Sequence, residues 1–285
     1  MSASRESRSE RGLPLPKAIL AHAVLIVLSA IFLVPLIWLI VSSLKTDAQI
    51  FKFPPEWIPS PATFHNYPSG LTFIPFWRDL CNTLIICSLS VVFTLMSCSL
   101  VAFGLARIRW RGRHALFYIL LGTMMLPAQV TMVPIFVIFA RLGWVDTFLP
   151  LVVPQLFANA FYVFLMRQFF LSIPPQLDEA ARIDGCSDWD IYRRIILPLS
   201  RPVMATVGLF CFLGAWNDYL GPLIYLADER KYTLSLALAS FSSQYGSYPG
   251  MLMAVTTVMT VPIIVLFFFA QRTFIQGITL TGIKG

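Results

Sequence analysis

Long apolar tracts separated by short charged segments dominate the pattern of the chain. They lie at about 18–44, 80–106, 114–140, 147–166, 202–227 and 250–271. Each is long enough for the ~20 apolar residues that a bilayer-spanning helix needs. The pattern predicts an all-α membrane protein with six transmembrane helices, in a domain that covers 18–285. Because the tracts are apolar almost throughout, they do not show which face of each helix lines a path.

Prolines lie inside several of these tracts, and membrane helices tolerate them where neighbouring helices or water satisfy the freed backbone groups. We therefore expect kinked helices around a cavity. The prolines concerned are Pro127, Pro134, Pro150, Pro154, Pro222 and Pro262.

Composition supports the membrane assignment. Hydrophobic residues make up 57% of the chain, charged residues 12%, and the mean hydropathy is +0.75. Such a chain has too little polar surface for a soluble globule of 285 residues. The first tract is too long for the core of a cleaved signal peptide, so we expect a retained helix. Residues 1–17 read as a disordered basic tail.

The basic residues orient the helices, because short cytoplasmic loops are enriched in Lys and Arg. With the N-terminus inside, both termini are cytoplasmic, and the outer loops are 45–79 and 228–249. The net charge of +7 follows from this topology and the lipid surface, without a nucleic-acid partner. Fifteen of the 21 Lys and Arg then lie in the cytoplasm: Arg5, Arg8, Arg11, Lys17, Arg107, Arg109, Arg111, Arg113, Arg167, Arg182, Arg193, Arg194, Arg201, Arg272 and Lys284.

Catalytic and metal-binding patterns are missing from the sequence. The five cysteines lie mostly in or at helices and suggest packing, and the three histidines have no metal-ligand spacing. No lysine follows a glycine, so there is no Walker A loop to hold phosphate. We expect no enzyme, no cofactor and no metal in this chain.

The cytoplasmic loop 172–202 carries the signals of two short helices. The Pro174–Pro175 pair suits a first helical turn, which needs no intrahelical N–H donor. Gly185 stands where a helix requires a left-handed C-terminal residue, Ser187 is a common N-cap, and Pro198 keeps the second helix short. On this physics alone, an ordinary amphipathic connector explains the loop as well as a docking element does. The expected outer residues are Asp184, Asp188, Asp190, Arg193, Arg194, Leu177, Trp189 and Ile195.

The same loop resembles the EAA loop of ABC importer permeases. That pattern is Glu-Ala-Ala, three residues, Gly, nine residues, then Ile-x-Leu-Pro, and every fixed position is met. The resemblance implies that the loop forms a coupling helix seated in a cleft of an ATPase subunit. The matching residues are Glu179, Ala180, Ala181, Gly185, Ile195, Leu197 and Pro198, and Asp184 lies among them.

Further segments resemble the carbohydrate branch of these permeases, of the maltose permease G type. They are FPPEWIPSPATFHNY from Phe53, GLARIRWRGR from Gly104, AWNDYLGPLIYL from Ala215 and GITLTGIKG from Gly277. The resemblance implies the type I importer architecture in a bacterial inner membrane. It also implies a second permease, two ABC ATPase subunits that hold ATP and Mg, a solute-binding protein and a carbohydrate substrate. Cys186 stands where the family often has Ala, and the first sixteen residues match nothing.

Asp218 is the one acidic residue within the expected tracts. An ionised Asp at a helix centre costs about 3 kcal/mol on insertion scales, so such residues usually face a bundle interior or water. Hydrogen bonds to sugar hydroxyls and contacts between helices or permease subunits both explain it. Candidates for the substrate path are Asp218 and Asn217, with Trp216 or Tyr219 as a ring face, and, with weaker claims, Asn159, Gln129 and Gln155.

These features together predict alternating access, in which ATP-driven closure of the ATPases moves 179–198 and rocks the helices. The outer segments Phe53–Tyr67 and Asp228–Tyr248 are expected to dock the binding protein. Three alternatives stay open: a permease for a phosphorylated polyol or an amino-acid-like solute, a secondary transporter, and a membrane enzyme. An enzyme would need paired carboxylates or metal ligands, and no basic residue lies in the expected tracts to favour an anion.

Overall fold

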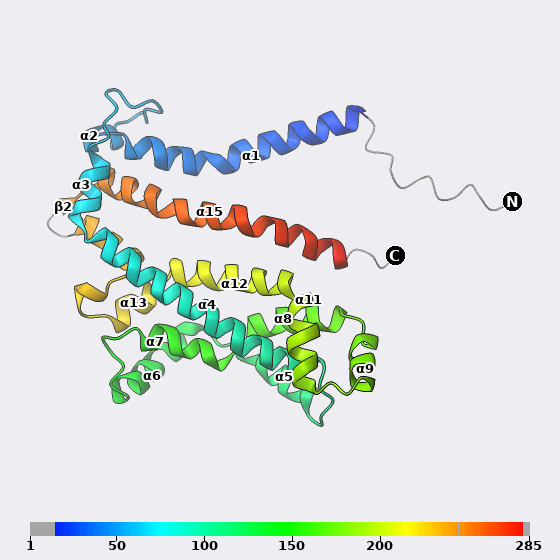
Figure 1. Cartoon of the computed structure of the whole chain (residues 1–285). Coiled ribbons are helices and arrows are strands. Elements are labelled where there is room, and N and C mark those ends of the chain that lie inside the picture. The colour runs from blue at the N-terminus through cyan, green and yellow to red at the C-terminus, as the bar shows by residue number, and fades with distance from the viewer. Residues whose placement is uncertain (1–14, 244–245, 282–285) are drawn as a thin grey trace. The chain divides into compact units, whose positions relative to one another are not determined.

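The computed structural model describes residues 15–243 and 246–281 (Figure 1). Most of the expected tail 1–17 therefore lies outside the described residues, as do the last four residues. The chain divides into two compact units. The first comprises residues up to Gly70 together with Tyr248–Thr257, and the second comprises Leu71–Ser247 together with the chain from Val258 onward.

The first unit contains the long helix α1 (Leu15–Ser43), the short helix α2 (Asp47–Ile50) and the start of α3 (Asn66–Phe73). The Asn66 side chain donates to the carbonyl oxygens of Ser43 and Lys45, at 2.9 and 2.8 Å. Lys45 is fully buried, and its Nζ lies 4.0 Å from the centroid of the Trp38 ring. A cation over an aromatic face thus stabilises the turn after α1.

Helix α4 (Phe76–Ala106) is the centre of the second unit, and it packs against α8 (Ala160–Ser172) and α12 (Arg201–Trp216). Side-chain hydroxyls of α4 also join it to the 3-10 turn Val153–Phe157 before α8: Thr94 donates to the Gln155 side chain at 3.3 Å, and Ser97 donates to the Gln155 carbonyl at 2.7 Å. Such hydrogen bonds suit helices in lipid, where unpaired polar groups are costly.

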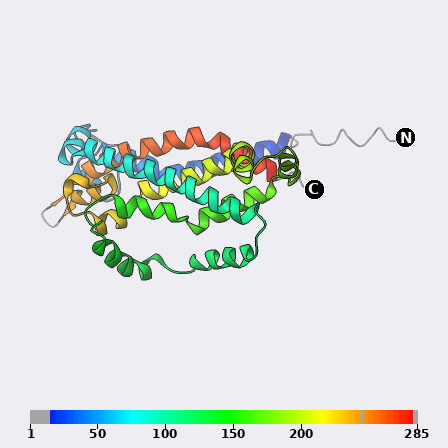
Figure 2. The same ribbon diagram turned by 60° about the horizontal axis from the view of Figure 1, so that its bottom comes forward.

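Two other helices of this unit, α5 (Arg113–Thr123) and α6 (Ala128–Arg141), follow each other on the far side of α8 from α4 (Figure 2). The tract 114–140 was expected to contain a kinked helix, and here the kink is a break at which the two helices meet at an angle of 96°. The break ends at Pro127, which is the N-cap of α6. A proline has no N–H to continue the preceding helix.

Breaks also occur in two other expected helices. The tract 147–166 consists of α7 (Leu149–Val152), a 3-10 turn (Val153–Phe157) and α8, separated at Ala158, whose φ is +59°. The tract 202–227 is interrupted after Trp216 and resumes as α13 (Leu220–Tyr225). Among the described residues, four helices are long and apolar enough to span a membrane, or up to six if each of two bent pairs is one span. This is a multi-pass membrane protein.

The remaining elements complete the chain in order. A 3-10 turn (Glu229–Lys231), α14 (Leu234–Ala237) and a second 3-10 turn (Leu238–Phe241) precede a minimal antiparallel hairpin of β1 (Ser242–Ser243) and β2 (Gly246–Ser247). The last helix, α15, runs over Pro249–Thr281.

Helix bounds change two expectations about charge. Because α4 begins at Phe76, it includes Asp79, so Asp218 is not the one acidic residue in the apolar part of the chain. Asp79 is buried and accepts from Arg78 Nε at 3.3 Å. Because α8 extends to Ser172, it includes the buried Arg167, which donates to the Leu105 carbonyl at 3.4 Å and lies over the Phe117 ring. A basic residue therefore does lie in a spanning segment.

Candidate coupling site and transmembrane pocket

The loop between α8 and α12 begins with helix α9 (Gln176–Ile183). Gly185 has φ +82°, a left-handed conformation that a side chain would strain. Its N–H donates to the Arg182 carbonyl at 3.1 Å, and the Cys186 N–H donates to the Ala181 carbonyl at 2.9 Å. This pair of bonds is the Schellman ending of a helix, and it confirms the predicted turn at Gly185.

A second run of helical turns follows and leads into α12. Ser187 caps α10 (Asp188–Ile191), with the Asp190 N–H donating to Ser187 Oγ at 3.2 Å and the Ser187 N–H donating back to the Asp190 carboxylate at 3.3 Å. A π-turn (Tyr192–Ile196) and α11 (Leu197–Leu199) complete the run, which ends one residue after Pro198. We call Gln176–Leu199 the knob.

One stripe of α4 holds the knob. Ser99, Phe103 and Arg107 are spaced i, i+4, i+8, so they lie on the same side of α4. The Ser99 hydroxyl is 2.8 Å from the Tyr192 hydroxyl, and the Phe103 and Tyr192 ring centroids are 5.2 Å apart. Arg107 Nε lies 3.3 Å from an Asp178 carboxylate oxygen, with both side chains under a tenth exposed. From the sequence, Asp178 was expected only in a helical first turn, and nothing in the sequence indicates this pairing with Arg107.

The inner face of the knob belongs to the largest apolar core of the second unit. Ala181, Ile191, Tyr192 and Ile196 are buried there among side chains of α4, α8 and α12. Ile195 and Leu197 are half-buried against the same core. The expected coupling residues therefore divide by burial, and those that remain exposed are Glu179, Ala180, Asp184, Gly185 and Pro198.

The outer face of the knob carries exposed apolar side chains among charges. Ile183 is 87% exposed, Trp189 59% and Leu177 42%. The prediction that Ile195 supplies outer apolar area is wrong, because that side chain packs inward, and Ile183 contributes area instead. Ile183 lies two residues, about 200° of helical turn, from the buried Ala181, so it must face away from the core. Clustered exposed apolar groups mark interaction surfaces.

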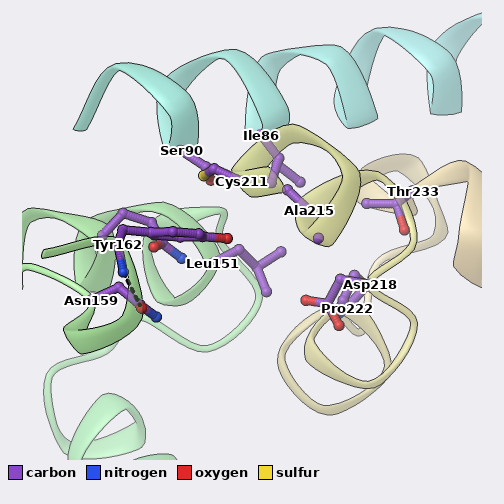
Figure 3. Close-up of a pocket in the computed structure, with 12 residues that line it drawn as sticks. Ile86, Ser90, Leu151, Asn159, Tyr162, Cys211, Ala215, Asp218, Pro222 and Thr233 are labelled. Carbon is purple, nitrogen blue, oxygen red and sulfur yellow. Dashed lines mark hydrogen bonds between the residues drawn. The ribbon is translucent and has the colours of Figure 1, made fainter. Parts of the chain in front are cut away.

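Three predicted path residues, Gln155, Asn159 and Asp218, meet in a pocket of about 190 Å³ in the apolar part of the same unit (Figure 3). Asn159 caps α8 by accepting from the N–H groups of Phe161 and Tyr162, and Asp218 accepts from the Gly221 N–H at 3.0 Å. Ser90 and Tyr162 also line the pocket. Ser90 and Tyr162 were not among the predicted path residues, although both are polar residues inside apolar tracts, which is a signal visible in the sequence.

The other path candidates do not line this pocket. Trp216 is fully buried and stacks on Phe212 with ring centroids 5.4 Å apart, so its ring is not available as a sugar platform in this chain. Asn217 is exposed and donates to the Leu213 carbonyl at 2.8 Å. Tyr219 and Gln129 are exposed elsewhere.

A third polar cluster, which we call the clamp, joins the loop before α7 to the segment after α13. One Asp146 carboxylate oxygen accepts from the N–H groups of Ala227 and Asp228, at 3.1 and 3.0 Å, and the other accepts from Lys231 Nζ at 2.6 Å. The Lys231 bond, aided by the backbone donors, lowers the pKa of Asp146 to about 2.

The clamp also reaches the start of α4. Arg78 donates to the Glu229 carbonyl at 2.8 Å, and Asn82 donates to the carbonyls of Arg230 and Tyr232, both at 3.0 Å. The knob and the clamp thus attach to opposite ends of the same helix. In Figure 1, α9 and α11 lie at the end of the unit where α4 finishes, and α13 lies at the other.

Comparisons with known proteins agree with this architecture. Residues 99–280 match the family of binding-protein-dependent transport system inner membrane components. An arabinooligosaccharide transport permease of Halalkalibacterium halodurans is 34% identical over 88% of this chain and 91% of its own length. A diacetylchitobiose uptake permease of Streptomyces coelicolor is 32% identical over 90% of this chain and 85% of its own length.

A solved structure is also similar. A chain of a bacterial ABC transporter involved in the import of the acidic polysaccharide alginate matches with a TM-score of 0.77 and 26% identity, over 95% of this chain and all of that chain. These relatives are transport permeases and not enzymes. The chain belongs to the binding-protein-dependent transport system inner membrane components, within the permeases of sugar ABC transporters.

Proposed function

We propose that this chain is the transmembrane permease subunit of an ATP-driven importer, which moves a sugar or oligosaccharide across a bacterial inner membrane. In this proposal the chain crosses the membrane six times with both termini in the cytoplasm. The bent pair of α5 and α6 is one span, and α12 belongs to another, whereas Asp188–Leu199 stays in the knob. The domain covers 18–285, with the coupling loop 172–202 inside and the loops 45–79 and 228–249 outside. The charge distribution supports this orientation.

The observation that carries the proposal is the two-sided knob. Its inner face is fixed to α4 by hydrogen bonding, ring packing and a buried ion pair, while its outer face presents Leu177, Ile183 and Trp189. A partner that pushes on the outer face would move α4 with the knob, because the contacts between them are packed and not elastic. We assign this role to ABC ATPase subunits, which would hold the ATP and Mg, since this chain has no Walker A loop.

Two ATPase copies imply two docking knobs, and this chain has one, so a second permease subunit completes the complex. The family description supports a solute-binding protein as a further partner. We assign its docking to the outer segments Phe53–Tyr67 and Asp228–Tyr248, of which residues 244–245 lie outside the described structure.

The pocket around Asn159 and Asp218 is the proposed contribution of this chain to the path. Its volume of about 190 Å³ is below the ~300 Å³ at which small-molecule sites usually begin, so one chain alone does not enclose an oligosaccharide. We infer that the second permease lines the rest of the path, so that the two chains together have room for the sugar. None of the residues that line the pocket is basic, which favours a sugar over a phosphorylated polyol.

Purification of the tagged chain from its host in mild detergent tests the complex. Mass spectrometry should find a second permease, an ATPase and a solute-binding protein with it. Recovery of the chain alone, under conditions that preserve other transporter complexes, would contradict the importer and favour a secondary transporter.

Glu179→Lys tests the knob itself. The exposed Glu179 lies on the proposed docking face, so charge reversal should abolish sugar uptake while the protein still inserts and assembles. The control is Arg111→Glu, a charge reversal at an exposed residue of the loop between α4 and α5, which should keep ATP-coupled uptake. Measurements are sugar uptake and binding-protein-stimulated ATPase activity in proteoliposomes. Unchanged coupling in Glu179→Lys would remove the proposed role of the knob.

A further inference from the structure

A second cavity, of about 240 Å³, lies between the segment after α4 and helix α9. Four arginines line it, together with two carboxylates, which leaves a formal charge of +2 at the cavity. The charged residues are Arg107, Arg109, Arg113, Arg182, Asp178 and Glu179. The transmembrane pocket described above, by contrast, has no basic lining residue.

The buried pair in this cavity is incompletely satisfied. The Arg107 side chain is 6% exposed, yet its Nε and Nη2 make no hydrogen bond to any described residue, and Asp178 approaches Nε only at 3.3 Å. One Asp178 oxygen is also without a hydrogen-bond partner there. A buried guanidinium N–H without an acceptor is costly. The Arg107 donors and one Asp178 oxygen therefore remain available to a ligand in the cavity.

We propose that this cavity binds the phosphate of an anionic phospholipid headgroup. Guanidinium groups match phosphate oxygens in a planar fork, and Arg107, Arg109 and Arg113 supply three of them around one space. Asp178 and Glu179 offset two of the four arginines, and the remaining formal charge of +2 attracts an anion. Basic cavities beside membrane helices on the cytoplasmic side are suited to acidic headgroups.

The surroundings of the cavity favour a lipid over a free anion. Trp110, between two of its arginines in sequence, is 41% exposed and anchors its ring N–H on the Gly104 carbonyl at 3.0 Å. Exposed tryptophans are typical of the membrane interface. Helix α5 leads away from Arg113 with exposed apolar side chains, including Leu116 at 48% and Ile119 at 66%, against which acyl chains can pack.

The site would connect membrane charge with the knob. Asp178, Glu179 and Arg182 belong to α9, whereas Arg107 and Arg109 follow α4, so a bound headgroup would bridge the two elements. The choice of the cytoplasmic leaflet rests on the proposed orientation. Lipid binding can be measured without ATPase or sugar, so its failure is distinguishable from a failure of the proposed function.

The test is native mass spectrometry of the full-length chain in detergent, titrated with phosphatidylglycerol or with phosphatidylcholine. We expect preferential binding of phosphatidylglycerol, and a loss of about fivefold in its affinity in Arg109→Gln, as for one basic contact to an acidic lipid. Arg109 makes no described hydrogen bond or ion pair, so this variant should fold; its thermal unfolding is the check.

Arg111→Gln is the matched control, because Arg111 is exposed in the same segment but does not line the cavity. Its affinity should change by less than about twofold. Equal losses in both variants would reduce the effect to general surface attraction and overturn the site. No preference for phosphatidylglycerol would exclude the lipid, and competition by inorganic phosphate alone would then assign the cavity to a free anion.

Discussion

The two ends of α4 are held in opposite ways. At the knob end, Ser99, Phe103 and Arg107 contact side chains that are almost completely buried. At the clamp end, Arg78 and Asn82 donate to backbone carbonyls, in a cluster whose ion pair, Lys231 with Asp146, keeps about a third of each side chain exposed.

The two ends of α4 therefore differ in how much free energy is lost when their contacts are disturbed. Contacts of exposed charges stabilise by little, since water competes for the same groups, whereas a buried pair is strongly destabilised when one partner is lost. The knob end suits the transmission of a displacement to α4. The clamp end can rearrange at small cost, as a segment that meets a soluble partner must.

The largest expected effect comes from Arg107→Met. It leaves Asp178 as a buried charge without its cation, and we expect a loss of about 3 kcal/mol, the lower end of the usual range because a cavity adjoins the pair. The double variant Arg107→Met with Asp178→Leu removes both charges and should recover most of that loss. Chemical unfolding in detergent measures both. A double variant as unstable as the single one would show that packing, and not charge, holds this contact.

Gly185→Ala should have the next largest effect. Nothing lies within 4 Å of the added Cβ, so the change acts only on the φ of +82° and should destabilise the chain by about 1–2 kcal/mol. Gly104→Ala is the control, because Gly104 also has open space around it but lies within helix α4. There alanine should be neutral or stabilise by up to about 1 kcal/mol. Equal effects in the two variants would contradict the left-handed turn.

Tyr192→Phe should destabilise by about 1 kcal/mol, the usual value of one hydrogen bond. It removes the bond to Ser99, whose hydroxyl keeps its bond to the Leu95 carbonyl at 2.5 Å. A double-mutant cycle with Ser99→Ala isolates the contact, because phenylalanine retains the ring packing on Phe103. Additive effects of the two changes would mean that the hydroxyls do not interact.

The knob shows how far sequence can predict a site. Its local structure was predictable, since Gly185 and Ser187 act on their own backbone within a few residues. The attachment of the knob to α4 was not predictable, because Asp178 and Arg107 are 71 positions apart in the chain. A charged residue in a sequence does not show which opposite charge it pairs with.

The helices show the same limit. Hydropathy predicted the apolar tracts, but it responds to composition and not to backbone direction. Pro127 marked the place of the bend between α5 and α6, but hydropathy could not foresee its angle of 96°, the break at Ala158, or the burial of Trp216. The bend angle, the break and the burial of Trp216 each depend on the residues that pack against that part of the chain.

The smallest expected effect is that of Asp146→Asn at the clamp, and it should depend on pH. Asp146 has a φ of +60°, which asparagine tolerates about as well, so the change removes charge with little added strain. The folded-state pKa of about 2 lies below the usual 3.8, so the carboxylate stabilises the fold above about pH 4, and this contribution is lost as pH falls toward 2. The variant should thus have a slightly lower unfolding temperature than the parent chain at pH 7, and the same unfolding temperature near pH 2. Because the clamp is exposed, high salt should also narrow the difference at pH 7. A difference that persists at low pH would mean that the asparagine amide oxygen fails to replace the carboxylate oxygen that accepts from the N–H groups of Ala227 and Asp228, and that the clamp depends on shape more than on charge.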